Sequence, residues 1–255
     1  MENLKVIFID IDNTLLDFDA YVRESLKSGM IHYGLGNYSE DVYRTFTRIN
    51  NRLWQDLEKD IITFDHIKAE RFNIIFKELG ISFDGPTFED YFREFLNESA
   101  IPVDGAYDLL RSLHGKYIIC AASNGPGFQQ RHRLDIAGMT KYFDHIFVSE
   151  DLGVSKPTKE FFDKCLEVIN NSADSGPIPY TGPDCCIIGD SLTADISGGR
   201  QYGMTAILFN KNNEDYSAQI KASPINNPDY VCNRLTEISK LFTGSRQNKR
   251  PDNQY

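Results

Sequence analysis

The stretch Val6-Ile7-Phe8-Ile9-Asp10-Ile11-Asp12-Asn13-Thr14, close to the start of the chain, decides the fold. Its first four residues are apolar and three of them are β-branched, with no polar alternation. Such a run is typical of a strand that is buried on both faces of a parallel sheet. Two carboxylates and a hydroxyl follow directly. The stretch therefore predicts a buried strand that carries reactive side chains at its carboxyl end.

Further apolar runs of the same kind recur along the chain. They are Tyr117–Ala122, His145–Val148, Cys185–Ile188, Thr205–Phe209 and the weaker Tyr230–Cys232. Helix-like stretches separate most of them, at Gly105–Ser112, Gly127–Ala137, Lys159–Asn170 and Thr193–Tyr202. Strands that alternate with helices indicate βαβ units. We therefore predict an α/β fold with a Rossmann-like, doubly wound parallel sheet.

The interval between Asp17 and Pro102 breaks this alternation, because it contains no convincing buried strand. Apolar residues recur there at the helical spacings of three and four, in the series Val42, Phe46, Ile49, Leu53, Leu57 and in the series Ile67, Phe72, Ile75, Phe76, Leu79. Gly85 and Pro86 mark a turn before a further helix around Phe88–Asn97. The insert is either a helical layer packed on the sheet or a mobile cap over an active site.

We predict the cap. The expected domains are a core of residues 1–17 and 103–243, an α-helical cap of residues 18–102, and a polar tail of residues 244–255 that is disordered. The segment Asn171–Asp184 is rich in Pro, Gly and Ser and predicts a surface loop.

Composition restricts the partners. The 255 residues are 41% hydrophobic and 25% charged, as in ordinary soluble proteins. The net charge of −10 argues against a nucleic acid polymer as partner, because no basic face is available to neutralise its phosphates. No stretch approaches the ~18 apolar residues of a membrane span. We expect a cytoplasmic protein without a membrane partner, either a monomer or a homodimer.

The residues that follow the predicted strands are the candidate site. In an open α/β sheet, ligands bind at the carboxyl ends of the strands. Asp10-Ile11-Asp12-Asn13-Thr14 follows the first run, and Ser123-Asn124-Gly125 follows the second. Ser155-Lys156-Pro157 comes some way after the third, and Gly189-Asp190-Ser191 follows the fourth, with Asp195 five residues beyond Asp190. Carboxylates, a hydroxyl, an amide and a lysine are thus predicted to meet at one edge of the sheet.

These residue types suit phosphate-ester chemistry. Asp10 and Asp12 lie two residues apart on an extended strand and point to the same side. One can attack as a nucleophile while the other transfers a proton to the leaving group. Ser123, the backbone around Asn124 and Gly125, and the Lys156 ammonium would bind the phosphoryl group. Thr14 either satisfies a turn or donates to the phosphate.

Clustered carboxylates also predict a metal site. Mg²⁺ prefers oxygen ligands and often uses one or two carboxylates together with substrate phosphate. Asp10 and Asp190 are the natural side-chain ligands, and the backbone carbonyl of Asp12 is a third. Asp195 could bind the metal directly, bind it through water, or orient its neighbours.

Together, Asp10-x-Asp12-x-Thr14, Ser123-Asn124-Gly125, Lys156-Pro157 and Gly189-Asp190-Ser191-x-x-x-Asp195 resemble the four-motif signature of the haloacid dehalogenase (HAD) superfamily. The resemblance covers the core from Asp10 to Asp195. It implies that Asp10 is the nucleophile, that Asp12 is the general acid/base, and that the cofactor is Mg²⁺. It also implies a helical C1-type cap inserted after the first strand. The metal-independent dehalogenases of this superfamily lack the second aspartate of the first motif, so Asp12 favours phosphoryl transfer.

A patchier resemblance narrows the substrate. The cap stretch Arg48–Trp54, the pair Arg71-Phe72 and the stretch Gly189–Gly199 are similar to the bacterial 5′-nucleotidases that act on noncanonical pyrimidine nucleotides. This implies a small phosphorylated metabolite, a nucleoside monophosphate such as dUMP, dTMP or UMP. Arg48, Trp54 and Arg71 are candidate cap contacts to it. The bland alternatives are a core position for the tryptophan and solvated helix positions for the arginines.

Other functions stay open. A sugar phosphate or a phosphoglycolate-type metabolite is the first alternative substrate, and a non-catalytic binding module on a degenerate core is the second alternative. No GxxxxGK[ST] loop, GxSxG elbow or complete GxGxxG after a strand occurs in the sequence. NTP hydrolysis, serine esterase chemistry and dinucleotide binding therefore lack support.

Overall fold

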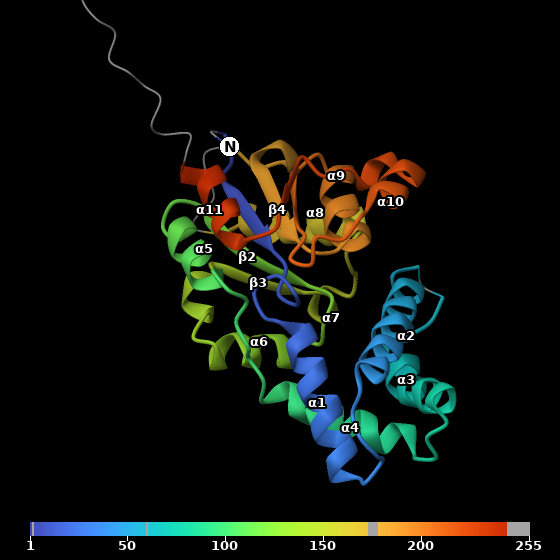
Figure 1. The fold of residues 1–255 in the computed structure, drawn as a ribbon. Coiled ribbons are helices and arrows are strands. Elements are labelled where there is room, and N and C mark those ends of the chain that lie inside the picture. Colours follow the sequence, from blue (N-terminus) through green and yellow to red (C-terminus); the bar gives the residue numbers. More distant parts are fainter. Residues whose placement is uncertain (2, 60, 173–177, 244–255) are drawn as a thin grey trace, which may run out of the picture. The chain divides into compact units, whose positions relative to one another are not determined.

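The computed structural model describes residues 1, 3–59, 61–172 and 178–243 (Figure 1). The chain forms two compact units. The core unit is Met1–Leu16, Pro102–Arg131 and the chain from Gly138 onward, and the cap unit is Asp17–Ile101 with His132–Ala137. The predicted domain boundaries did not include this last segment, which is the end of helix α6.

In the described part of the chain, six parallel strands form one sheet in the order β3-β2-β1-β4-β5-β6. The strands are β1 (Val6–Ile9), β2 (Ile118–Ser123), β3 (His145–Val148), β4 (Cys185–Gly189), β5 (Thr205–Phe209) and β6 (Tyr230–Cys232). The sheet confirms the predicted doubly wound α/β fold. Each predicted apolar run forms a strand, with ends shifted by one residue at most.

Strand β1 lies between β2 and β4, with Ile9 opposite both Ala121 and Ile188. The order of the strands reverses between β1 and β4, which is the position where open α/β sheets bind ligands. The residues that follow β1 and β4 therefore occupy the topological switch point of the sheet.

Both faces of β1 are buried, as its unbroken apolar sequence predicts. Val6 and Phe8 point to one face and Ile7 and Ile9 to the other, and all four are 0% exposed. The Phe8 ring packs edge-on against Phe162 of helix α8 (Lys159–Asn170), with 5.8 Å between ring centroids. Burial of both faces explains why the strand Val6–Ile9 contains no polar residue.

The remaining elements of the core unit connect and flank these strands. The helices are α5 (Ala106–Leu113), α6 (Gly127–Ile136), α7 (Ser149–Leu152), α8, α9 (Ser197–Gln201), α10 (Ser217–Ala222) and α11 (Leu235–Thr243). Single turns lie at η1 (Thr140–Tyr142), η2 (Gly182–Asp184), η3 (Leu192–Ile196) and η4 (Pro224–Asn226). The sequence did not predict α7, α10 or α11, which are short and lack a long apolar period.

The helix predicted at Thr193–Tyr202 differs from the structure in one respect. The chain first makes a π-helical turn, η3, and only then the α-helix α9. Residues 173–177 of the predicted surface loop and the predicted polar tail lie outside the described residues.

In the part of the cap unit that the structure describes there are four long helices, α1 (Phe18–His32), α2 (Glu40–Glu58), α3 (Phe64–Leu79) and α4 (Gly85–Asn97). Asp17, Thr63 and Asp84 cap the amino-terminal ends of α1, α3 and α4 with side-chain oxygens. The apolar faces meet in a cluster centred on Phe72, whose ring packs against those of Phe46, Phe76, Phe88 and Phe92. Within its described residues the insert is helical, as its periodicity predicts.

None of the described helices combines the length and the apolar character needed to cross a membrane.

Candidate active site

Asp10 stands directly after β1, at the centre of the sheet. Its backbone N–H donates to the Ile188 carbonyl of β4 at 2.9 Å, so the strand ladder fixes the backbone at this residue. A tight loop follows, in which the Ile11 carbonyl accepts from the amides of Leu15 and Leu16, each at 2.9 Å. Asn13 adopts the left-handed conformation with φ 59°, which asparagine tolerates better than most residues. This loop places Asp12 next to the strand end, on a backbone that has little freedom.

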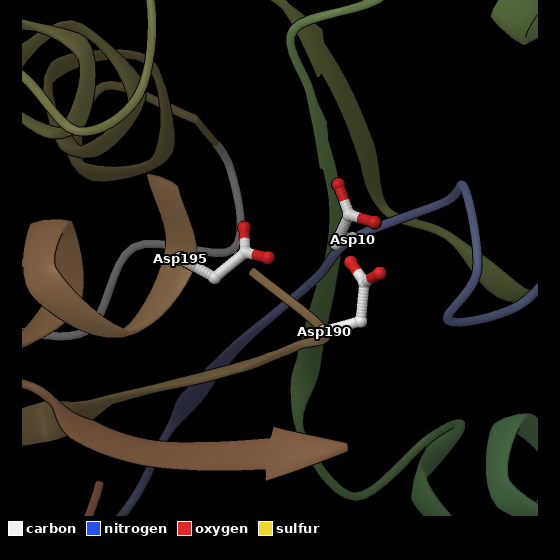
Figure 2. Close-up of side chains that lie close together, drawn as sticks. All are labelled: Asp10, Asp190 and Asp195. Atoms are coloured by element: carbon white, nitrogen blue, oxygen red, sulfur yellow. The ribbon is translucent and has the colours of Figure 1, made fainter. Parts of the chain in front are cut away.

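Three carboxylates meet at the switch point of the sheet. Asp10, Asp190 and Asp195 each offer one oxygen, and these oxygens lie within 4.8 Å of one another. Figure 2 shows the three carboxylates facing a common space. Hard carboxylate oxygens at this spacing are the ligands that Mg²⁺ prefers, so the residues fit the predicted cation. The Asp12 side chain is not part of this group, and its predicted contribution is the backbone carbonyl.

Lys156 is buried beside this cluster, with 1% of its surface exposed. Its ammonium nitrogen lies 2.8 Å from Asp10 Oδ1, 2.6 Å from Asp195 Oδ1 and 2.6 Å from the Ala122 carbonyl. An ammonium group has three donors, and these three acceptors match them. The ammonium therefore connects the ends of β1 and β2 with the turn that carries Asp195. A phosphoryl oxygen could bind Lys156 only by sharing or replacing one of these acceptors.

The electrostatics of the cluster depend on burial. The pKa of the Asp10 carboxyl is raised to about 7, chiefly by burial and also by the nearby Asp195 and Asp12, while Lys156 acts in the opposite direction. Burial alone would lower the pKa of the Lys156 ammonium, but Asp10 and Asp195 outweigh it and raise that pKa above its usual value. Lys156 therefore stays charged, and additional positive charge at the site would favour the ionised form of Asp10.

The π-helical turn η3 holds Asp195 in the cluster. The Ser191 N–H donates to Asp195 Oδ2 at 3.1 Å, and Ser191 Oγ accepts from the Ala194 N–H at 3.1 Å. A Cβ atom at Gly189 would lie 2.1 Å from Asp195 Oδ2, so only glycine lets the carboxylate approach the end of β4. Single π-turns inside helices often mark functional sites. Asp195 is at once a member of the carboxylate cluster and a partner of Lys156.

The segment after β2 is built around Ser123, which is 2% exposed. Ser123 Oγ accepts from the Gly125 N–H at 3.0 Å and from Gln130 Nε2 at 2.9 Å. The Asn124 side chain pairs with the Lys156 backbone through bonds of 2.8 and 2.9 Å. Asn124 thus positions the backbone of Lys156. Ser123 Oγ accepts two hydrogen bonds, so its own hydroxyl hydrogen is available for donation.

Thr14 is fully buried in the loop after β1. Among the described residues its hydroxyl oxygen finds no hydrogen-bond partner. A buried hydroxyl without a partner is costly, so this position is consistent with the predicted contact to an incoming group.

The candidate cap contacts occupy three different environments. Arg71 is 5% exposed, and its guanidinium binds both carboxylate oxygens of Glu89, at 2.6 and 3.0 Å, and Asn50 Oδ1 at 2.8 Å. Its side chain therefore lies in the interior of the cap and ties α3 to α4 and α2. Trp54 is half-buried against Phe64. Arg48 is exposed and forms a surface ion pair with Glu78.

Sequence reasoning missed two polar residues of the site. Gln130 of α6 donates to Asp12 Oδ2 at 2.6 Å, and Lys211, which follows β5, donates to Asn13 Oδ1 at 3.0 Å. Gln130 is 118 positions from Asp12, and Lys211 is 198 positions from Asn13. No motif or spacing rule links such distant residues, and only their place beside predicted strand ends could have drawn attention to them.

The comparisons with known proteins agree with the fold. Residues 4–203 match the family model of the haloacid dehalogenase-like hydrolases. The chain is 32% identical over 242 residues to the HAD-hydrolase named YfnB from Bacillus subtilis (strain 168), and the match covers 95% of this chain and 97% of YfnB. The chain belongs to the haloacid dehalogenase-like hydrolases.

Two further relatives are named as pyrimidine 5′-nucleotidases. The pyrimidine 5′-nucleotidase PynA of Streptococcus pneumoniae (strain ATCC BAA-255 / R6) is 32% identical, over 84% of this chain and 87% of PynA. The pyrimidine 5′-nucleotidase YjjG of Escherichia coli (strain K12) is 28% identical, over 92% of this chain and 96% of YjjG.

A solved structure of YfnB matches the whole fold. Its TM-score is 0.81 at 31% identity, covering 93% of this chain and 98% of the YfnB chain. That crystal structure is bound to magnesium and reveals interdomain movement in YfnB.

Proposed function

We propose that the chain is a Mg²⁺-dependent phosphomonoesterase that forms an aspartyl-phosphate at Asp10 and acts on pyrimidine nucleoside 5′-monophosphates. The observation that carries this proposal is the double environment of Asp10. Its carboxylate belongs to the cluster with Asp190 and Asp195, and its Oδ1 lies 2.8 Å from the buried Lys156 ammonium. A carboxylate between a metal-type donor set and a fixed cation suits attack on an anionic phosphate.

The first half-reaction breaks the ester bond. A carboxylate oxygen of Asp10 attacks phosphorus, and the bond from phosphorus to the ester oxygen breaks. Asp12 gives its proton to that oxygen, so the product leaves as a neutral alcohol. Ser123 donates its hydroxyl hydrogen to a phosphoryl oxygen, and Thr14 and the backbone near Gly125 complete the phosphate site.

The second half-reaction restores the enzyme. Asp12, now ionised, takes a proton from water while the water oxygen attacks phosphorus. The bond between phosphorus and Asp10 breaks, inorganic phosphate leaves, and Asp10 is again a carboxylate. Asp12 thus acts first as acid and then as base, which returns it to its starting state in each cycle.

Mg²⁺ would be held by Asp10, Asp190 and the Asp12 carbonyl, with Asp195 as a direct or water-mediated ligand. When bound, the cation supplies positive charge that shields the attacking carboxylate from the negative phosphate. This charge and that of Lys156 would offset the repulsion between an anionic substrate and a chain whose net charge is −10.

The choice of substrate rests on the relatives. PynA and YjjG are named pyrimidine 5′-nucleotidases and match most of this chain. The cap would select the substrate, with Arg48 and Trp54 as the more exposed candidate contacts and Arg71 as a buried candidate.

The test is phosphate release across nucleoside monophosphates, sugar phosphates and short-chain phosphates, with Mg²⁺ and with EDTA. We expect Mg²⁺-dependent release with pyrimidine monophosphates preferred, no release in EDTA, and none from Asp10→Asn. The control is Asp108→Asn, which changes an exposed carboxylate paired with Arg111 on α5 and should keep full activity. Full activity of Asp10→Asn, or in EDTA, would contradict the mechanism, and a preference for sugar phosphates would contradict only the substrate.

A further inference from the structure

Gln130 joins two groups of the site that come from different strand ends. It lies on α6 and is 1% exposed. Its amide nitrogen Nε2 donates to Asp12 Oδ2 at 2.6 Å and to Ser123 Oγ at 2.9 Å. The two amide hydrogens are therefore divided between the carboxylate after β1 and the hydroxyl at the end of β2.

The backbone around Gln130 is adapted to this contact. A Cβ atom at Gly125 would lie 2.2 Å from Gln130 Nε2. This is too close for two non-bonded heavy atoms, so the Gln130 side chain would have to move. The Gln130 N–H bonds the Pro126 carbonyl at 3.0 Å and so fixes the helix turn that carries the side chain. The glycine in Ser123-Asn124-Gly125 therefore makes room for this amide.

The contact determines what Ser123 can do. Its oxygen has two lone pairs, and these accept from the Gly125 N–H and from Gln130 Nε2. The remaining capacity of the hydroxyl is its single hydrogen, which can only be donated. Gln130 thus helps to fix Ser123 as a donor, the role that an anionic phosphoryl oxygen requires.

The contact also determines how Asp12 is oriented. An amide nitrogen carries hydrogens only, so Oδ2 of Asp12 must accept from it and cannot hold a proton directed at it. A proton that Asp12 delivers to a leaving group therefore points away from Gln130. The bond fixes the carboxylate torsion at the same time, and a small misplacement of a reacting group can cost about a hundredfold in rate.

We propose that Gln130 is a positioning residue that holds Asp12 in the orientation for proton transfer to the leaving group. The inference rests on the proposed acid/base role of Asp12. If the role of Gln130 were purely structural, its bonds to Asp12 and Ser123 would only satisfy a buried amide. Its replacement would then slow all substrates by the same factor. The two roles therefore predict different kinetics. A loss of proton delivery slows the reaction of a poor leaving group more than that of a good one, whereas a purely structural loss does not.

The experiment compares kcat/KM for benzyl phosphate and 4-nitrophenyl phosphate with Mg²⁺ present. The benzyl alcohol needs a proton to leave, whereas 4-nitrophenolate leaves readily as an anion. Gln130→Met keeps the length of the side chain and removes both donors. We expect its kcat/KM for benzyl phosphate to fall about tenfold or more beyond the fall for 4-nitrophenyl phosphate, within the ~10²–10⁴-fold that proton transfer supplies. The ratio of the two constants cancels the fraction of folded enzyme, so partial unfolding cannot produce the result.

Two further variants separate the possible failures. Gln129→Met changes the neighbouring buried glutamine of the same helix and should alter both constants by the same factor. Asp12→Asn should show a leaving-group preference in the same direction as Gln130→Met. The double variant should be no more selective than Asp12→Asn alone. An unselective Asp12→Asn would overturn the role of Asp12 and this inference with it. A selective Asp12→Asn with an unselective Gln130→Met would overturn the inference alone, and would mean that Gln130 acts only through Ser123 or through stability.

Discussion

At the scale of single residues, the site holds more negative charge than its lysine neutralises. Asp10, Asp190 and Asp195 bring three carboxylates into a space in which their oxygens lie within 4.8 Å. One ammonium group, that of Lys156, contacts two of them. Burial and the neighbouring charges of Asp195 and Asp12 raise the pKa of Asp10, and a further cation would offset this repulsion. We therefore expect the site to bind a divalent cation even without substrate.

This imbalance predicts a change in stability on metal binding. Mg²⁺ that binds only the folded chain should raise the free energy of unfolding, by about 2.7 kcal/mol at a hundredfold excess over its Kd. Asp190→Asn removes a ligand and should abolish most of this gain. Thermal unfolding with and without Mg²⁺ measures the effect with no reference to activity. Asp108→Asn should keep the full gain, and an equal gain in Asp190→Asn would place the cation elsewhere.

Residues with a chemical signature were predictable, and those that support them were not. Asp10, Asp12, Ser123 and Asp190 closely follow apolar runs, and Lys156 and Asp195 come a few residues later in recognisable motifs. Gln130 and Lys211 are ordinary polar residues whose place depends on how distant segments pack. The bonding of Lys156 to the Ala122 carbonyl could not be foreseen for the same reason. Sequence patterns report local structure, whereas side-chain partners across the sheet are set by tertiary packing.

At the scale of elements, the strands were the most predictable part of the fold. The ends of β1, β3, β5 and β6 lie where the sequence predicts them. The reason is clearest for β1, because a strand that is buried on both faces must be apolar throughout. The short helices α10 and α11 carry too few turns for a clear helical period. The turn η3 was read as the start of an α-helix, because a π-turn leaves no sign in the sequence and is held here by Asp195 and Ser191.

The cap helices supply a prediction about a buried ion pair. Arg71 of α3 binds Glu89 of α4 and Asn50 of α2 where the Arg71 and Glu89 side chains are only 7% and 3% exposed. Arg71→Met leaves the Glu89 charge buried without its partner and should cost about 3–5 kcal/mol of stability. Urea unfolding measures the loss. Arg48→Met breaks a surface pair with Glu78 and should cost about 1 kcal/mol or less.

The double variant Arg71→Met with Glu89→Leu completes this cycle. Removing both charges should recover most of the stability, because apolar residues of similar volume often replace a buried pair without loss. Equal losses in Arg71→Met and Arg48→Met would show that the network of α2, α3 and α4 contributes no more than a surface pair. A loss of substrate affinity at full stability would instead give Arg71 a direct role in binding.

At the scale of the whole molecule, the helical insert leaves the core unit after Leu16 and rejoins it at Pro102, at adjacent points. Leu16 and Pro102 pair in an isolated β-bridge, and the Val103 N–H donates to the Leu15 carbonyl at 2.9 Å. An insertion between neighbouring backbone positions leaves the sheet and its strand order unchanged. The core motifs and the helical insert can therefore vary independently, so one mechanism can serve many substrates.

This arrangement predicts the effect of removing the cap. A short Gly/Ser linker in place of residues 17–101 would join Leu16 to Pro102 and keep Asp10, Asp12, Ser123, Lys156 and Asp190. If the cap selects the substrate, kcat/KM for a pyrimidine monophosphate relative to 4-nitrophenyl phosphate should fall by about tenfold or more, because the discriminating contacts are lost. Thermal stabilisation by Mg²⁺ would verify that the shortened chain retains the folded site. A shortened chain that is stabilised by Mg²⁺ and ranks the substrates as the full chain does would show that selection resides in the core, in residues near Ser123 and Gly125, and not in the insert.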